Sequence, residues 1–291
     1  MRDFAALLDA VRGLRWPART AVRSGIPGAH GSRMRGISTE FAEHRAYSQG
    51  DDRARIDWRL FARTDRAHIR LSNDRAILPT TIVLDASASM DFPVATHGKW
   101  RLATELAIGL AAVARGAADP VGLVVVRESQ SIRLPPRSRH GVIHEMIRAI
   151  GETEPGGSES LLPALAAAAR AGERVVIISD FLSDADDLLD LAARIVTSGG
   201  ELHALHVVAP EELDPPRDTV LVADPESPEI RRTLTGDARR AYVSAFAAWR
   251  DTLAHDWSDA GIAYTLAVTG AETTDHLVRR VTAPRGAAAG A

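Results

Sequence analysis

The stretch TTIVLDASASM occupies residues 80–90 and decides both the predicted fold and the candidate site. Its first part, 80–85, is a short apolar run rich in β-branched residues, which is typical of a central strand buried on both faces. The polar residues DASASM follow at once, at 85–90. In an open parallel sheet, ligands collect where the carboxyl ends of strands meet the next loops. The stretch therefore predicts a parallel sheet with a polar site at the end of its central strand.

Apolar runs alternate with helical patterns from residue 80 to the end of the chain. We therefore predict an α/β fold: an open, mainly parallel six-stranded sheet with helices on both faces and one antiparallel edge strand, 131–136. The stretch 214–226 is predicted as a hairpin-like excursion. The other predicted strands are 120–129, 173–180, 201–209 and 261–269, and the predicted helices are 99–119, 140–151, 161–172, 184–198, 229–256 and 273–281.

The first 75 residues lack this alternation. They begin with an amphipathic helical pattern, continue through a Gly- and Arg-rich link at 25–36, and end with the strand pattern HIRLS at 68–72. We predict an N-terminal extension, 1–75, that packs its aromatic side chains on a main domain, 76–285. A flexible tail, 286–291, completes the chain.

The composition limits the chemistry that is available. The chain has 291 residues and no cysteine, which excludes disulfides, thiolate zinc sites and cysteine nucleophiles. Any metal must therefore be held by oxygen or histidine. The N-terminus carries charges inside its apolar pattern, unlike a secretory signal, and no apolar run reaches the length of a membrane span. We expect a soluble cytoplasmic protein without a membrane span.

The charge is distributed unevenly along the chain. Residues 1–75 contain fifteen Arg and nine Asp or Glu, a net charge of +6, so the remainder carries −9 of the total −3. A basic arm is one way to bind nucleic acid. However, Arg and Asp alternate within 45–75 instead of forming a block, which favours solvated ion pairs. A basic-arm nucleic-acid binder is therefore kept only as an alternative.

Three predicted strand-end loops carry hard oxygen ligands. Their candidate ligands are Asp85, Ser87, Ser89, Ser158 or Ser160, and Asp180. A hydroxyl-rich set of low charge suits Mg²⁺ or Mn²⁺ in octahedral geometry with waters retained. Such a cation favours a carboxylate supplied by a partner. Taken singly, Ser89 or Ser160 is also a typical helix cap, and Asp85 is typical of a turn.

The loops resemble known motifs. DASASM resembles the DxSxSM motif of the von Willebrand factor A fold, GGSES at 156–160 resembles its threonine loop, and SD at 179–180 resembles its later aspartate. Upstream, YSQGDDRARIDWRLFAR at 47–63 resembles the signature of the bacterial von Willebrand factor A-like family known as domain of unknown function fifty-eight. The resemblance extends from about residue 30 to 280 and includes the segments HVVAPEELDPP and VLVADPE.

This resemblance implies a metal-ion-dependent adhesion site. Its ligands would be Asp85, Ser87, Ser89, Ser158 and Asp180, with Mg²⁺ or Mn²⁺ as the cofactor. Members are typically encoded beside MoxR-type AAA ATPases, which implies an adaptor or co-chaperone that serves such an ATPase and an unidentified client protein. The chain departs from the family in having serine where threonine is usual. Ser158 is preferred to Ser160 because it directly follows the glycine pair.

The strongest catalytic alternative is a metal-dependent phosphohydrolase of the haloacid dehalogenase type, because Asp85 ends a predicted strand. That chemistry needs a second aspartate two residues later as general acid, and position 87 is serine. It also needs a lysine beside the phosphate, and the only lysine, Lys99, begins the first helix of the main domain instead of following a later strand. We therefore predict protein binding without catalysis.

The segment GDDRARIDWRLFAR at 50–63 has two interpretations. In one it is a structural clasp, with Trp58 buried as an anchor and Asp51, Asp52 and Asp57 paired with neighbouring arginines. In the other, Asp51, Asp52 and Trp58 form a partner surface beside the metal. We expect the clasp, because one aromatic anchor among alternating charges is what packing an extension requires.

Overall fold

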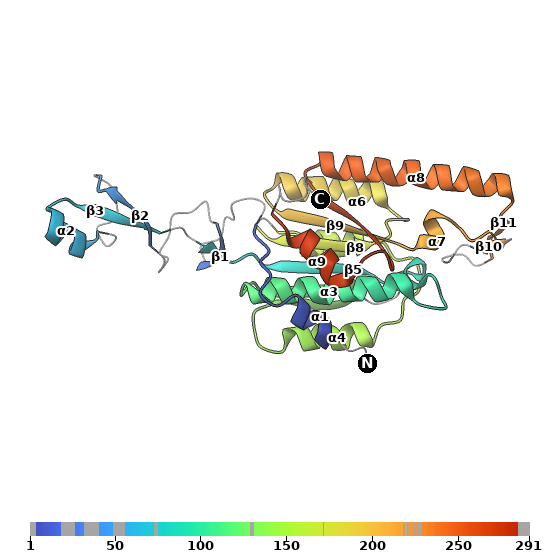
Figure 1. Ribbon diagram of the computed structural model, residues 1–291, viewed down its shortest axis with the longest axis horizontal. Coiled ribbons are helices and arrows are strands. Elements are labelled where there is room, and N and C mark those ends of the chain that lie inside the picture. Colours follow the sequence, from blue (N-terminus) through green and yellow to red (C-terminus); the bar gives the residue numbers. More distant parts are fainter. Residues whose placement is uncertain are drawn as a thin grey trace.

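The computed structural model describes residues 4–18, 27–31, 41–48, 56–72, 75–128, 131–170, 172–217, 219, 221–223, 225 and 229–284. Its centre is a six-stranded sheet with the order β12-β9-β8-β5-β6-β7 (Figure 1). Neighbouring strands are parallel except β6 and β7, so the predicted fold class is confirmed. The strands are β5 (Thr80–Asp85), β6 (Val121–Val126), β7 (Ile132–Arg137), β8 (Arg174–Ser179), β9 (Glu201–Val208) and β12 (Ala263–Val268).

The central strand β5 lies between β6 and β8, and all six of its residues are buried. Successive side chains of a strand point to opposite faces, so Ile82 and Leu84 join one hydrophobic cluster and Val83 joins the other. This burial on both faces explains the continuously apolar run. Asp85, the last residue of β5, pairs in register with Val126 at the carboxyl end of β6.

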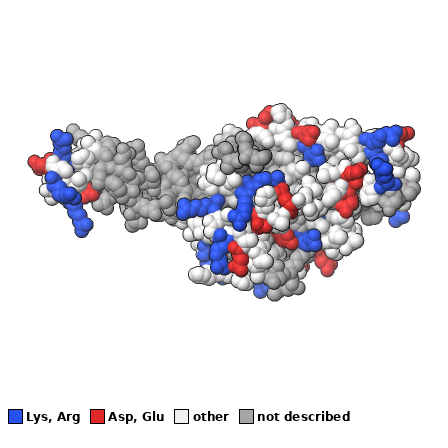
Figure 2. Space-filling model, in the orientation of Figure 1, with Lys and Arg blue, Asp and Glu red and all other residues white. Residues whose placement is uncertain are grey.

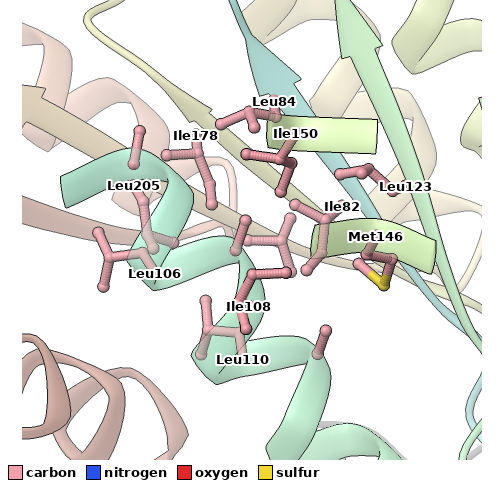
Figure 3. Packing of buried hydrophobic residues seen from close by; sticks show 14 of the residues in the cluster. Ile82, Leu84, Leu106, Ile108, Leu110, Leu123, Met146, Ile150, Ile178 and Leu205 are labelled. Atoms are coloured by element: carbon pink, nitrogen blue, oxygen red, sulfur yellow. The ribbon is translucent and has the colours of Figure 1, made fainter. Parts of the chain in front are cut away.

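Helices cover both faces of the sheet (Figure 1). One face carries α1 (Ala5–Ala10), α3 (Gly98–Gly116), α4 (Val142–Gly151) and α9 (Thr274–Thr282), and the other carries α5 (Leu162–Ala168), α6 (Ala185–Thr197) and α8 (Gly236–Asp259). Leu106 of α3 and Met146 of α4 belong to the same cluster as Ile82 (Figure 3). A Cβ on Gly109 would lie 2.8 Å from Val278 Cγ2, so α3 and α9 pack closely. Tight packing holds α3, and therefore its first turn, in a fixed position.

The first helix belongs to this packed body. Phe4, Val11 and Trp16 are buried in the cluster that contains α3, and Arg279 donates to the carbonyl oxygen of Ala10 at 2.6 Å. Trp16 also lies under the Arg174 guanidinium, whose carbon is 4.0 Å from the ring centroid. The start of the predicted extension is thus integrated with the main sheet.

The predicted clasp is different. A small unit of β2 (Phe41–Ala46), β3 (His68–Ser72) and α2 (Trp58–Thr64) lies apart from the main sheet in Figure 1. Trp58 is 62% exposed and contacts Phe61 edge to face at 5.9 Å, so the prediction that Trp58 is a buried anchor is wrong. The physical reason is that this small unit lies apart from the main sheet, so Trp58 packs on Phe61, three residues along the same helix face, and not on the main domain. Asp51 and Asp52 lie outside the described residues.

The segment after β9 contains short elements that the sequence patterns placed imperfectly. It begins with α7 (Pro210–Leu213), and β10 (Leu221–Ala223) then pairs with β11 (Arg231–Thr233) as an antiparallel hairpin. The helix predicted from residue 229 therefore begins only at Gly236, after Thr235 caps it by accepting from the Ala238 amide at 3.2 Å. The remaining short pair is β1 (Pro27–Gly31) with β4 (Arg75–Ala76). In the described ranges, no helix is both long and apolar enough to cross a membrane.

Candidate metal centre

The site begins with Asp85, which is only 4% exposed at the end of β5. Its Oδ1 accepts a hydrogen bond from the Ser87 amide at 2.9 Å, and its Oδ2 accepts one from the Ser179 hydroxyl at 2.6 Å. Ser179 is the last residue of β8, the strand beside β5. Two adjacent strand ends therefore fix both oxygens of one buried carboxylate, as expected for the edge of a parallel sheet.

The hydroxyls of Ser87 and Ser89 lie next, with their Oγ atoms 3.0 Å apart. Both side chains are buried, at 5% and 2% exposure, around the 3₁₀ helix η2 (Ala88–Asp91). Ser87 precedes η2 but makes no side-chain capping hydrogen bond to it. Neighbouring ligands of an octahedral Mg²⁺ ion with metal–oxygen bonds of about 2.1 Å are about 3.0 Å apart. The two hydroxyls are hydrogen-bonded to each other at this distance, which also matches an edge of such an octahedron.

A glycine pair joins the second loop to the first. The Gly156 amide donates to Ala86 O at 2.8 Å, and the Ala88 amide donates to Gly157 O at 2.9 Å. The Ser160 hydroxyl accepts from the amide of Leu162, the first residue of α5, at 3.2 Å. Ser158, which is exposed and directly follows the paired glycines, stays the predicted ligand from this loop.

Gly157 makes this loop contact possible. Its φ is +75°, and a Cβ at this position would lie 2.5 Å from Glu128 Cβ. Gly157→Ala should therefore lower the free energy of unfolding by about 1–3 kcal/mol, measured by urea denaturation. Gly156→Ala is the matched control, since a Cβ there meets nothing within 4 Å. Equal effects of the two substitutions would contradict this account of the loop.

The third loop places Asp180 directly after β8, at 3% exposure. Its Oδ2 accepts from Lys99 Nζ at 2.6 Å, and its Oδ1 accepts from the Leu182 amide at 3.3 Å. Lys99 Nζ also donates to Glu212 Oε1 at 2.8 Å, while Glu212 Oε2 accepts from the Ala209 amide at 2.7 Å. Asp180 therefore reaches the site already paired with a buried cation.

Sequence reasoning missed three members of this network, Lys99, Ser179 and Glu212. Lys99 has no exposed surface and pairs with Asp180, because α3 brings it to the same edge of the sheet. Its separation from Asp180 along the sequence had suggested that it lies away from the site. One signal was available, since Lys99 is the only lysine in an Arg-rich chain. Ser179 and Glu212 carried no comparable signal.

Burial and mutual charge set the protonation of the two groups at the centre of the site. Burial, followed by the charge of Asp180, raises the pKa of Asp85 to about 6, although the hydrogen bonds from Ser179 and Ser87 oppose this. Burial alone would lower the pKa of Lys99, but Asp180 and Glu212 outweigh it and raise that pKa, so the ammonium stays charged. A divalent ion beside Asp85 would remove the penalty of a buried carboxylate.

The raised pKa of Asp85 predicts an unusual pH dependence of stability. The folded protein holds this proton more tightly than the unfolded chain, so the stability contributed by the group is present below pH 4 and is lost as pH rises to about 6. In chelator at pH 7, Asp85→Asn should therefore be more stable than wild type by about 1–3 kcal/mol, and the gap should close near pH 4.

Urea denaturation at both pH values measures this difference. Glu159→Gln, on the exposed part of the neighbouring loop, is the matched control and should change the free energy of unfolding by less than about 0.5 kcal/mol. A destabilised Asp85→Asn at pH 7, or a difference that does not vary with pH, would show that burial does not penalise the Asp85 carboxylate.

The residues present fit a hard cation held by few charges. Within the described ranges, no three His, Cys, Asp or Glu side chains gather as a metal-binding group. The candidate donors are instead one carboxylate, Asp85, and the hydroxyls of Ser87 and Ser89. Oxygen donors of this kind suit Mg²⁺ or Mn²⁺. Three ligands leave the other octahedral positions to water or to a group from outside.

Comparisons with known proteins place the chain in a family. The family described as "Protein of unknown function DUF58" matches residues 43–252. The uncharacterized proteins Rv1480 of Mycobacterium tuberculosis and Mb1516 of Mycobacterium bovis are each 30% identical over 297 residues, covering 99% of this chain and 93% of the relative.

Similar solved structures include the conserved hypothetical protein BatB from Bacteroides thetaiotaomicron, with a TM-score of 0.46 and 16% identity over 70% of this chain and 97% of that one. The SpRpn10 VWA domain has a TM-score of 0.41 and 13% identity, covering 70% of this chain and 94% of that one. On the family match and the full-length relatives, the chain belongs to the DUF58 family.

Proposed function

We propose that this protein binds Mg²⁺ or Mn²⁺ through Asp85, Ser87 and Ser89, with Ser158 and Asp180 as further ligands, and uses an open ligand position of the ion to hold a carboxylate of a partner protein. The carrying observation is the buried triplet itself, in which two hydroxyls lie 3.0 Å apart beside an immobilised carboxylate. When bound, the cation would supply an electrophilic centre for the partner's carboxylate. The protein residues position that centre and limit its charge.

The proposed partner is a MoxR-type AAA ATPase, with this protein acting as its adaptor or co-chaperone for a client protein. Two observations support this proposal. The chain belongs to the DUF58 family, and the candidate ligands of the site leave part of the cation's coordination shell open for a partner. The role is binding and not catalysis, because Ser87 occupies the position at which a phosphohydrolase of this geometry needs its general acid.

A pull-down with the purified ATPase of the same genome tests this function. We expect capture in Mg²⁺ or Mn²⁺ to exceed capture in chelator by at least about tenfold, which corresponds to 1.4 kcal/mol. Asp85→Ala should lose the metal-dependent part of this capture. The control Asp91→Asn should retain it, because Asp91 pairs with His97 and lies outside the triplet. Equal capture in chelator by wild type would contradict the metal-mediated grip.

A metal-dependent phosphohydrolase is the second candidate, favoured by one observation. Lys99 Nζ lies 2.6 Å from Asp180 Oδ2, so a buried lysine does reach the residue that follows β8, a position at which such enzymes carry an acidic motif. Release of phosphate from p-nitrophenyl phosphate that Asp85→Ala abolishes would establish this function. Nucleic-acid binding has less support, because Arg and Asp alternate within residues 45–75. Figure 2 shows side chains of both charges on the visible face of the main domain.

A further inference from the structure

Large apolar side chains are exposed mainly at one end of the molecule. Of the seven such side chains among the described residues, all but Trp58 lie on segments that follow the carboxyl ends of β5, β8 and β9. We call these six the apolar rim: Val94, Leu182, Leu221, Val222, Ile230 and Tyr242. Single exposed apolar residues are ordinary, but their concentration around a buried polar site indicates an interaction surface.

Two members of the rim lie on the loops that build the site. Val94, 69% exposed, lies three residues after Asp91, the end of η2. Leu182, 49% exposed, donates its amide hydrogen to Asp180 Oδ1 at 3.3 Å. Both are therefore held within a few residues of the candidate ligands, one on each side of the sheet edge.

The other members belong to the hairpin and the start of α8. Leu221, Val222 and Ile230 are 54%, 38% and 47% exposed, and the hairpin lies at the same end of the molecule as α7 (Figure 1). The base of the hairpin is fixed, because Arg239 of α8 donates to the carbonyl oxygens of Pro215, Pro216, Arg217 and Thr219.

Tyr242 connects this surface to the site. Burial and the nearby charge of Glu212 raise the pKa of the Tyr242 hydroxyl to about 12. Glu212 in turn holds Lys99, which holds Asp180. Since α7, which carries Glu212, also contacts α8, which carries Tyr242, this part of the rim lies beside the ionic network of the site.

We propose that the apolar rim docks a partner segment in which a single acidic side chain is flanked by large apolar side chains. The acidic group would complete the cation's ligands, and its apolar neighbours would pack on the rim. This inference rests on the proposed function and adds the chemical class of the segment. One acidic group is specified because one carboxylate can fill an open position of the cation, and the flanking apolar groups are specified because the exposed rim side chains are apolar.

A displayed peptide library with one fixed aspartate and randomised neighbours tests the inference on the full chain. In Mg²⁺ we expect enrichment of Leu, Ile, Phe or Met beside the aspartate, and no selection in chelator. A selected peptide remade with serine at its apolar positions should bind at least about tenfold more weakly, which corresponds to 1.4 kcal/mol. Its aspartate-to-asparagine version should lose metal-dependent binding.

The rim variant is Leu182→Ser with Leu221→Ser. The control is Ala6→Ser, at an exposed position of α1 outside the rim. The rim variant should keep the aspartate requirement and lose the apolar preference, while the control keeps both. An aspartate requirement in wild type without apolar preference would overturn the rim proposal and leave the metal grip standing. Selection that is independent of both Mg²⁺ and the aspartate would overturn both the rim proposal and the proposed metal-mediated binding.

Discussion

Replacing Lys99 by methionine should lower the free energy of unfolding by about 3–5 kcal/mol at pH 7. Methionine has a similar length but no charge, so it leaves Asp180 and Glu212 facing each other in a buried setting. Burial, and to a smaller extent Asp180, already raise the pKa of Glu212, and the charge and hydrogen bond of Lys99 are the largest effects that oppose this rise. Urea denaturation of the metal-free protein measures the loss.

The double variant Lys99→Met with Glu212→Gln separates charge from packing. It removes one of the two carboxylates that the ammonium neutralised, so it should recover part of the lost stability. The two changes should therefore be strongly non-additive, as is usual for residues in one network. A loss below about 1 kcal/mol in Lys99→Met, or no recovery in the double variant, would show that Lys99 is not the counterion of this site.

Arg174→Met should be comparably destabilising, by about 3–5 kcal/mol. Arg174 has no exposed side-chain surface, and its Nε donates to Glu201 Oε1 at 2.8 Å. Its Nη2 donates to the carbonyl oxygen of Trp16 at 3.3 Å and to that of Pro17 at 3.1 Å. The substitution should also raise the rate of backbone amide hydrogen exchange in the first helix, residues 5–10. Arg170→Met, on an exposed side chain, is the control.

Glu201 gives this second prediction a pH signature. Burial would raise its pKa, but the hydrogen bond from His203 and the charge of Arg174 lower it to about 2. A carboxyl with a depressed folded pKa contributes stability above about pH 4.5, and that contribution is lost as pH falls towards 2. The difference between wild type and Arg174→Met should therefore shrink in acid. A difference that stays constant with pH would contradict the ion pair's role.

Local patterns predicted the sheet well, and non-local pairing limited the rest. The strand 80–85 was predicted with its observed bounds because burial on both faces leaves a continuous apolar run. By contrast, the helix predicted from residue 229 starts at 236, since Arg231–Thr233 is recruited as a strand by pairing with Leu221–Ala223. Helical periodicity in one segment carries no information about such a partner.

The same limit applies to the candidate site. Asp85, Ser87 and Ser89 form one short motif, and the strand-end rule placed Asp180 near them. The contacts that hold these residues span far more of the chain: Lys99 reaches Asp180 over 81 residues and Glu212 over 113, and Ser179 reaches Asp85 over 94.

Trp58 shows the opposite error. An aromatic residue among alternating charges predicted a buried anchor from local pattern alone, yet its ring is 62% exposed. Its exposure depends on how far its small unit lies from the main sheet, which no local pattern encodes. The alternative interpretation of Trp58 as part of a partner surface stays a prediction.

Isothermal titration of Mn²⁺ and Mg²⁺ into the purified, metal-free protein tests the central claim most directly. We predict saturable binding at one site in wild type, weakened at least about tenfold in Ser87→Ala with Ser89→Ala. That variant keeps Asp85 and removes only the two hydroxyls. The control Ser160→Ala removes a hydroxyl that accepts from the Leu162 amide, and it should bind as wild type does. No saturable binding in wild type, or equal binding in the double variant, would contradict a metal centre built on the Asp85 motif.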